Sequence, residues 1–327
     1  MIMKKIIIAI FSILSLNLFG QKIESGSLDV FYFQNSSTVS VEWDNNIEFA
    51  KGISFEEYSK GEFSTEEWNN KVLPSTMMSF IKKLNSYTSK HGITFTNNSQ
   101  DAEYKMMVKP TQLGRKGGGV TIYTIKKISS NEDVAVIKHR NSAGLFGNNI
   151  PTLLSETYSR SGKSLGKLFE EVMLKPCKIK TVVENNEMNY RYDFTSLELT
   201  DIKAKEFFVS SGAEIKGKTI VVPEKITSLI DGVFISSANK KMSKSGYELN
   251  NQTSSNIEVV ISFVEIGQEG KHSVVAKLIE KSSGKVLSRL GVEIGDGKLN
   301  SFQNLFCEQM EKTGEEFGEI LKDEILK

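Results

Sequence analysis

The stretch ETYSRSGKSLGKLFEEVM, which spans Glu156–Met173, recurs later in the chain as EQMEKTGEEFGEILKDEI, Glu308–Ile325. Apolar residues recur in both stretches at helical spacing, so each stretch predicts an amphipathic helix. One constant shift between them also superposes two pairs of glycines: Gly162 on Gly314, and Gly166 on Gly318. The recurrence predicts that the chain contains two copies of one domain, each closed by this helix.

The segments before the first of these helices predict one α+β unit. A helix is expected over 65–89, capped at Ser64, divided by Pro74 and ended by Gly92. Residues 44–63 are expected to form an irregular loop. β-branched and aromatic residues favour strands at 27–33, 38–43, 93–96, 102–110, 120–128 and 133–139.

The second half repeats this order, and Gly246 there matches Gly92. Strands are expected at 190–199, 218–222, 256–263, 274–280 and 286–294, and helices at 223–244 and 299–326. The sequence therefore predicts an α+β fold of two tandem copies of a small domain. Each copy, 21–185 and 186–327, is expected to be a mixed β-sheet packed by two helices.

Residues 1–20 have the pattern of a secretory signal peptide. Lys4 and Lys5 precede an apolar run, and Gly20 offers a small residue at the cleavage position. No cysteine follows the run, so the bacterial lipoprotein route is not expected. The protein is therefore predicted to be periplasmic or secreted, with no membrane span after the signal peptide is removed.

The overall charge balance argues against nucleic acid as a partner. The chain has 41 Lys and Arg against 40 Asp and Glu, so no broad basic field is expected. The two cysteines, Cys177 and Cys307, occupy non-equivalent places in the two copies. An oxidising compartment would permit a disulfide between them, but two separate thiols are the preferred interpretation.

The four helix glycines need an explanation, because a glycine inside a helix costs about 0.5–1 kcal/mol relative to alanine. In each copy the two glycines are four residues apart and share one face of the helix. Close backbone packing is the preferred interpretation, and a ligand or partner segment on that face is the alternative. A phosphate-binding loop at Gly162-Lys-Ser164 is rejected, because position 157 is Thr where that motif needs Gly.

Other candidate sites are weaker. Gly114–Gly119 places two basic residues among glycines, and a mobile hairpin connection is preferred over an anion-binding loop. Glu42 and Asp44 flank Trp43, which would suit a sugar-binding corner, although solvated surface residues are the simpler interpretation. The three histidines show no metal-ligand spacing. We therefore expect no catalytic residue, no cofactor and no metal site.

Three motifs carry a family resemblance: Val39–Asp44, Asp101–Tyr104 and Gly162–Lys167. With the signal peptide, the first and third resemble a group of uncharacterised secreted proteins of Bacteroidota, over about residues 1–175. The second, placed after a helix and a short strand, more distantly resembles periplasmic α+β domains such as the TolB amino-terminal domain. The resemblance implies a compartment and a fold, but no activity.

The function expected from these observations is binding without catalysis. An exported accessory protein of the cell envelope, with an envelope protein or a glycan as its partner, is the preferred hypothesis. One alternative is an envelope glycan hydrolase that uses scattered carboxylates, and another is a structural spacer in an envelope complex. Two facing carboxyl groups in a cleft, one of them desolvated, would favour the hydrolase, and an exposed apolar surface would favour binding.

Overall fold

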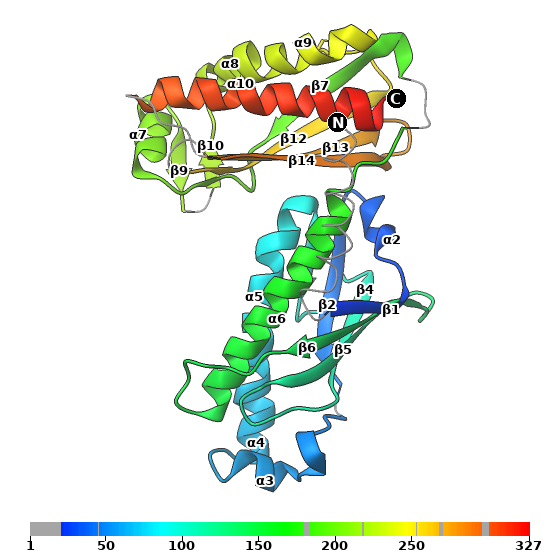
Figure 1. Cartoon of the computed structure of the whole chain (residues 1–327), viewed down its shortest axis with the longest axis vertical. Helices are drawn as coiled ribbons and strands as arrows, with labels where there is room; N and C mark the ends of the chain where they lie inside the picture. The colour runs from blue at the N-terminus through cyan, green and yellow to red at the C-terminus, as the bar shows by residue number, and fades with distance from the viewer. Residues whose placement is uncertain are drawn as a thin grey trace, which may run out of the picture. The chain divides into compact units, whose positions relative to one another are not determined.

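A computed structural model describes residues 21–44, 46–179, 183–217, 219–252, 254–267, 271–295 and 301–327. The predicted signal peptide, residues 1–20, lies outside them. The described chain divides into two compact units (Figure 1). The first unit contains the residues up to Phe31 together with Ser36–Val172, and the second contains Tyr32–Asn35 together with Met173–Lys327. The division thus falls earlier than the predicted position near residue 185, and a short N-terminal segment belongs to the second unit.

The first unit is built on a six-stranded mixed sheet with the order β1-β6-β5-β4-β2-β3. β2 runs parallel to both of its neighbours, β3 and β4, and the other pairs are antiparallel. Buried residues alternate along the strands, so one face of the sheet packs on the core. The strands are β1 (Gln21–Gly26), β2 (Ser37–Trp43), β3 (Ile93–Thr96), β4 (Tyr104–Pro110), β5 (Gly119–Lys127) and β6 (Asp133–Asn141).

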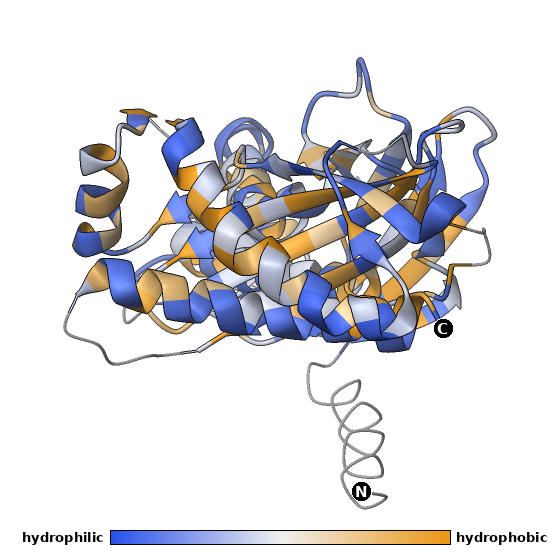
Figure 2. Cartoon of the chain, turned by 90° about the horizontal axis from the view of Figure 1, so that it is seen from above, coloured by the Kyte–Doolittle hydropathy of each residue, from blue (hydrophilic) through white to orange (hydrophobic). Residues whose placement is uncertain are grey.

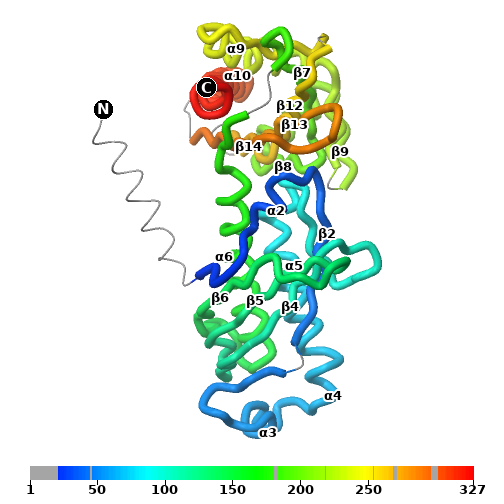
Figure 3. The backbone as a smooth tube through the Cα atoms, turned by 90° about the vertical axis from the view of Figure 1, so that its right-hand side faces the viewer, coloured from blue at the N-terminus to red at the C-terminus, as the bar shows by residue number. Residues whose placement is uncertain are grey.

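Two long helices, α5 (Leu73–Thr88) and α6 (Ile150–Met173), lie side by side on one face of this sheet (Figure 1). Three short helices accompany them: α2 (Asp29–Tyr32), α3 (Phe55–Ser59) and α4 (Thr65–Glu67). α3 and α4 lie beyond one end of the sheet (Figures 1 and 3). Both begin with a capping box, from Ser54 and Ser64 respectively, which confirms the predicted cap at Ser64.

The second unit has an equivalent sheet with the order β11-β7-β12-β13-β14, and the short strand β8 also pairs with β12. β7 is parallel to β11 and β12, as β2 is to β3 and β4. A separate hairpin is formed by β9 and β10. The strands are β7 (Glu187–Asp193), β8 (Glu198–Leu199), β9 (Glu214–Lys216), β10 (Thr219–Val221), β11 (Glu248–Leu249), β12 (Ile257–Ile266), β13 (His272–Glu280) and β14 (Val286–Ile294).

The helices of the second unit are α7 (Ile202–Ser210), α8 (Glu224–Ile230), α9 (Ser236–Met242) and α10 (Phe302–Ile320). A π-helical turn, Asp231–Ile235, joins α8 to α9, and another, Leu321–Ile325, extends α10. The helices carry hydrophilic and hydrophobic residues in alternation along their length (Figure 2), as amphipathic packing requires. The matched strand order and the helix pairs make the protein an α+β fold of two related units.

Two local details recur in both units. Asn85 exchanges two hydrogen bonds of 2.8 Å with the backbone of Phe95 on β3. Asn239 does the same with Leu249 on β11, at 2.9 and 2.8 Å. Gly92 and Gly246 both end their helices in the left-handed conformation, with φ of 82° and 81°. Each unit therefore joins its first long helix to its edge strand in the same way.

The four helix glycines lie where the two helices of each unit approach most closely. A Cβ atom on Gly162 would lie 2.5 Å from the carbonyl oxygen of Phe80, and one on Gly314 would lie 2.3 Å from that of Phe234. At Gly318 the carbonyl oxygen of Ala238 would be 2.4 Å away, whereas at Gly166 the nearest atom is the side-chain Cβ of Tyr87, at 2.8 Å. Three of these four contacts are with backbone atoms of the facing helix. The glycines therefore let the backbones of the two helices approach closely.

Several elements differ from the sequence prediction. The strand expected at 27–33 is wrong, because Leu28 and Phe31 are both fully buried at helical spacing in and beside α2, and Ser27 accepts the N–H of Asp29. The predicted division near Pro74 takes the form of a π-helical turn, Trp68–Val72, between α4 and α5. Pro74 then lies in the first turn of α5, where an N–H is least needed.

The remaining differences lie in turns and short helices. Residues 44–63 contain α3 as well as loop. The strand expected at 190–199 is interrupted after Asp193, whose carboxylate accepts the N–H of Thr195 and so forms a turn. The helix α7 was not predicted, although its N-cap residue Asp201 is a recognisable start signal.

Candidate functional site

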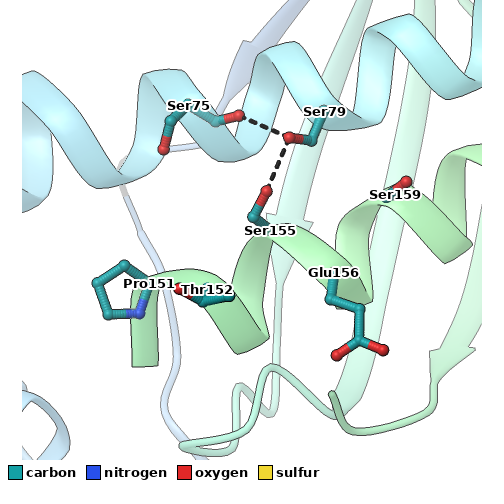
Figure 4. Close-up of a pocket in the computed structure, with 7 residues that line it drawn as sticks. All are labelled: Ser75, Ser79, Pro151, Thr152, Ser155, Glu156 and Ser159. Atoms are coloured by element: carbon teal, nitrogen blue, oxygen red, sulfur yellow. Dashed lines mark hydrogen bonds between the residues drawn. The ribbon is translucent and has the colours of Figure 1, made fainter. Parts of the chain in front are cut away.

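A shallow groove of about 520 Å³ opens between α5 and α6 in the first unit. Hydroxyl groups dominate it, and Figure 4 shows Ser79 placed between Ser75 and Ser155. The Ser79 hydroxyl lies 2.7 Å from the Ser155 hydroxyl and donates to the Ser75 carbonyl oxygen at 3.1 Å. The lining residues are Ser75, Ser79, Pro151, Thr152, Ser155, Glu156 and Ser159.

Glu156 is the carboxylate of this region, and its side chain points to the other side of α6 (Figure 4). It accepts the backbone N–H groups of Leu145 and Phe146 at 2.8 and 3.1 Å, and it pairs with Arg160. The N–H of Phe146 above all, together with Arg160 and the N–H of Leu145, holds the pKa of this carboxyl below its usual range. Glu156 therefore stays ionised, which is the opposite of what a general acid needs.

The segment that Glu156 holds is the loop between β6 and α6, residues 142–149, called here the Leu145–Phe146 loop. Leu145 is 70% exposed and Phe146 is 88% exposed. The loop packs tightly on Leu153, because a Cβ on Gly144 would lie 2.6 Å from the Leu153 carbonyl oxygen and one on Gly147 would lie 2.9 Å from its side chain. The loop therefore has a fixed backbone and presents two adjacent large apolar side chains to the outside.

A second loop, between β4 and β5, supports the first. The N–H of Gly144 donates to the carbonyl oxygen of Lys116 at 2.7 Å, and the Thr157 hydroxyl donates to the same oxygen at 3.1 Å. The Arg160 guanidinium donates to the carbonyl oxygen of Ala143 at 3.3 Å. The glycine-rich stretch Gly114–Gly119 is thus the predicted hairpin connection, and it braces the exposed loop.

The sugar-binding corner, the alternative interpretation of Glu42, Trp43 and Asp44, is not formed. Glu42 pairs with Lys105 at 3.1 Å, and Trp43 donates its ring N–H to the carbonyl oxygen of Leu73 at 3.2 Å. Asp44 instead accepts the N–H of Asn46. The three side chains are therefore engaged with different neighbours.

The cysteines and histidines do not gather into a site. Cys177 and Cys307 are free thiols. His139 is buried on β6, and burial lowers its pKa to about 4, so its ring is neutral. Within the described residues, no cluster of three or more potential metal ligands occurs.

The second unit contains two polar clusters of its own. Tyr190 and Tyr192 on β7 donate to one carboxylate oxygen of Asp231, at 2.9 and 2.5 Å, and burial raises the pKa of both phenols. This cluster ties the π-helical turn after α8 to the sheet. The buried guanidinium of Arg289 donates to the carbonyl oxygens of Tyr32 and Gln34, at 2.8 and 2.6 Å, and so fastens the segment Tyr32–Asn35 within this unit.

A second depression, of about 480 Å³, lies beside β8 and the β9–β10 hairpin. Ile215 on β9, one of its lining residues, is 41% exposed. Four exposed apolar residues lie in this region, but they are spread over α7 and the hairpin: Ile202, Val209, Ile215 and Val221. The Leu145–Phe146 loop differs because its two apolar side chains are adjacent and their backbone is fixed.

Comparisons with known proteins add little. No family model matches the chain, and no curated protein matches it. The dodecameric PelC of Paraburkholderia phytofirmans is similar at 12% identity with a TM-score of 0.27, over 45% of this chain and 96% of that one. The protein XCC0632 of Xanthomonas campestris, assigned to DUF330, is similar at 9% identity with a TM-score of 0.26, over 44% and 87%. Similarities of this size support no statement about function.

Proposed function

We propose that the protein is an exported accessory protein of the cell envelope that acts by binding, and that the Leu145–Phe146 loop is a contact surface. Export is supported by the sequence of residues 1–20, as argued above. The observation that carries the binding role is the adjacent pair of apolar side chains, exposed by 70% and 88% on a fixed loop. Large apolar side chains grouped on a surface mark interaction sites.

The way in which the loop is held strengthens this proposal. Glu156 already accepts the backbone N–H groups of Leu145 and Phe146, the tip of the loop. A partner can therefore cover these two residues without burying an unsatisfied N–H group of either one. Because the backbone is fixed before binding, little conformational entropy is lost when the side chains are covered. Aromatic anchors of this kind dominate the binding energy of interfaces.

Site-specific crosslinking in the native envelope tests the proposal. A photoreactive benzoyl-phenylalanine replaces Phe146 in one variant and Ile202, which is 72% exposed in the second unit, in a matched control. We expect light-dependent adducts with an envelope component at position 146 and fewer at position 202. Absence of any adduct at position 146 would overturn the proposal, and turnover of an envelope glycan by the same preparation would favour a hydrolase instead.

A further inference from the structure

The tip of the Leu145–Phe146 loop is suited to an apolar medium. Its two side chains are adjacent and protrude on a fixed turn. A segment that enters the boundary of a bilayer must satisfy its backbone donors internally, because hydrocarbon offers no acceptor. The carboxylate of Glu156 meets this requirement for both residues of the tip.

The sequence around the tip is basic, although the whole chain is neutral. Residues 104–131 contain no Asp or Glu, and residues 134–169 contain only Glu156. That one acid is occupied by Arg160 and by the loop backbone. Both loops of this end, 114–119 and 142–149, come from these acid-poor stretches, which also contain Arg115, Lys116, Arg140, Arg160 and Lys163.

Several lysines of the sheet are already paired with carboxylates. Four sheet lysines are each matched by a carboxylate: Lys105 by Glu42, Lys109 by Glu48, Lys126 by Asp133 and Lys138 by Glu24.

Lys116, in the loop whose backbone contacts Gly144, and Arg140, near the end of β6, are exposed and have no ion pair within the described part of the chain. The nearby acid Glu62 accepts the N–H of Ile150, and Glu57 accepts that of Ser54. Lys116 and Arg140 therefore remain available to an external anion.

We infer that this loop is a contact site for the surface of an anionic lipid bilayer. Leu145 and Phe146 enter the interfacial region, and Lys116 and Arg140 lie among the phosphate headgroups. Apolar side chains and basic residues together are what peripheral binding needs. The inference rests on the proposed function and specifies its partner. An anionic membrane is favoured over an apolar protein pocket because exposed, unpaired cations lie in the supporting loop and near the end of β6, the strand that leads into the tip.

Vesicle binding tests this inference. The protein beginning at Gln21, the start expected after export, is mixed with vesicles of phosphatidylcholine alone or with added phosphatidylglycerol, and binding is measured by flotation. We expect binding to the anionic vesicles that is about tenfold tighter or more, and weaker in high salt. Leu145→Ser and Phe146→Ser should each weaken it by about tenfold or more, whereas the matched variant Ile202→Ser should leave it unchanged.

Two further measurements separate insertion of the loop into the bilayer from other causes of vesicle binding. Phe146→Trp should show a blue-shifted fluorescence component with anionic vesicles only, and Lys116→Gln with Arg140→Gln should reduce the preference for anionic lipid. Circular dichroism of each variant checks that the fold is intact. Absence of vesicle binding, or binding that Leu145→Ser and Phe146→Ser leave unchanged, would overturn the lipid inference. If position 146 then crosslinks to an envelope protein, the binding function stands and only its lipid partner is rejected.

Discussion

The contact between α10 and the π-helical turn Asp231–Ile235 predicts whether a glycine-to-alanine substitution there raises or lowers the free energy of unfolding. Gly314 and Gly232 both lie in helical backbone, but the space around them differs. A Cβ on Gly314 would lie 2.3 Å from the carbonyl oxygen of Phe234, whereas a Cβ on Gly232, in the same turn as Phe234, would meet nothing within 4 Å. Alanine at either position gains helix propensity, but only at position 314 does it meet backbone.

The expected magnitudes follow from these distances. To bring the new methyl group at position 314 out to 3.0 Å, the helices must separate by at least about 0.7 Å, and overpacking of this kind costs about 1–3 kcal/mol. After the helix-propensity gain of about 1 kcal/mol is subtracted, Gly314→Ala should lower the free energy of unfolding by up to about 2 kcal/mol. Gly314→Leu should lower it further, and Gly232→Ala should raise it by about 0.5–1 kcal/mol.

Scanning calorimetry of the protein beginning at Gln21 measures both effects. For units of this size each kcal/mol shifts the Tm by about 2–4 °C, so Gly314→Ala and Gly232→Ala should move the transition of the second unit in opposite directions. In the first unit, Gly162→Ala should behave like Gly314→Ala, because its Cβ would lie 2.5 Å from a carbonyl oxygen. Equal or greater stability for both Gly162→Ala and Gly314→Ala would refute close helix packing as the reason for these glycines.

Three further predictions concern buried polar groups. Burial lowers the pKa of His139 to about 4, so the unfolded chain binds a proton below about pH 6.5 that the folded chain does not. The stability that neutral His139 contributes is complete above pH 6.5 and is lost as the pH falls toward 4, so the wild type should lose about 2–3 kcal/mol more than His139→Gln between pH 7 and 4.5 in urea titrations. Gln309 is 1% exposed and neither amide atom has a hydrogen-bond partner within the described residues, so Gln309→Met should raise the urea midpoint, and a lowered midpoint would contradict this. Asn85→Ala and Asn239→Ala each remove two hydrogen bonds to an edge strand and should each cost about 1–3 kcal/mol in the same assay.

The sequence predicted those parts of the fold that depend on local pattern. The helix stretches, the alternating strand at 102–110 and the capping residue Ser64 are all encoded by residues close together in the chain. The helix α2 was missed because its aromatic residues also favour a strand, and only the burial of Phe31 against Tyr104 and Phe169 decides between them. Long-range packing of this kind cannot be read from a window of neighbouring residues.

The candidate surface was missed for a different reason. Residues 144–149 lie outside the helices and strands that the sequence predicts, and the net charge of the whole chain is close to zero. That near-zero total conceals the acid-free stretch 104–131 and the single acid in 134–169. What no count could supply is the role of Glu156, whose carboxylate turns a Gly-rich loop into a fixed support for Leu145 and Phe146.

Comparison of the two units separates features of the common fold from features of one unit. The helix glycines, the paired Asn85 and Asn239, and the left-handed glycines before the edge strands recur in both units, so the shared architecture requires them. The shift that superposes the two signature helices places Gly144-Leu-Phe146 opposite residues 296–298, which are Asp-Gly-Lys. If the apolar pair were needed to close the unit, the second unit would have apolar residues at these positions. The apolar pair is therefore a feature of the first unit alone, as the proposed contact requires.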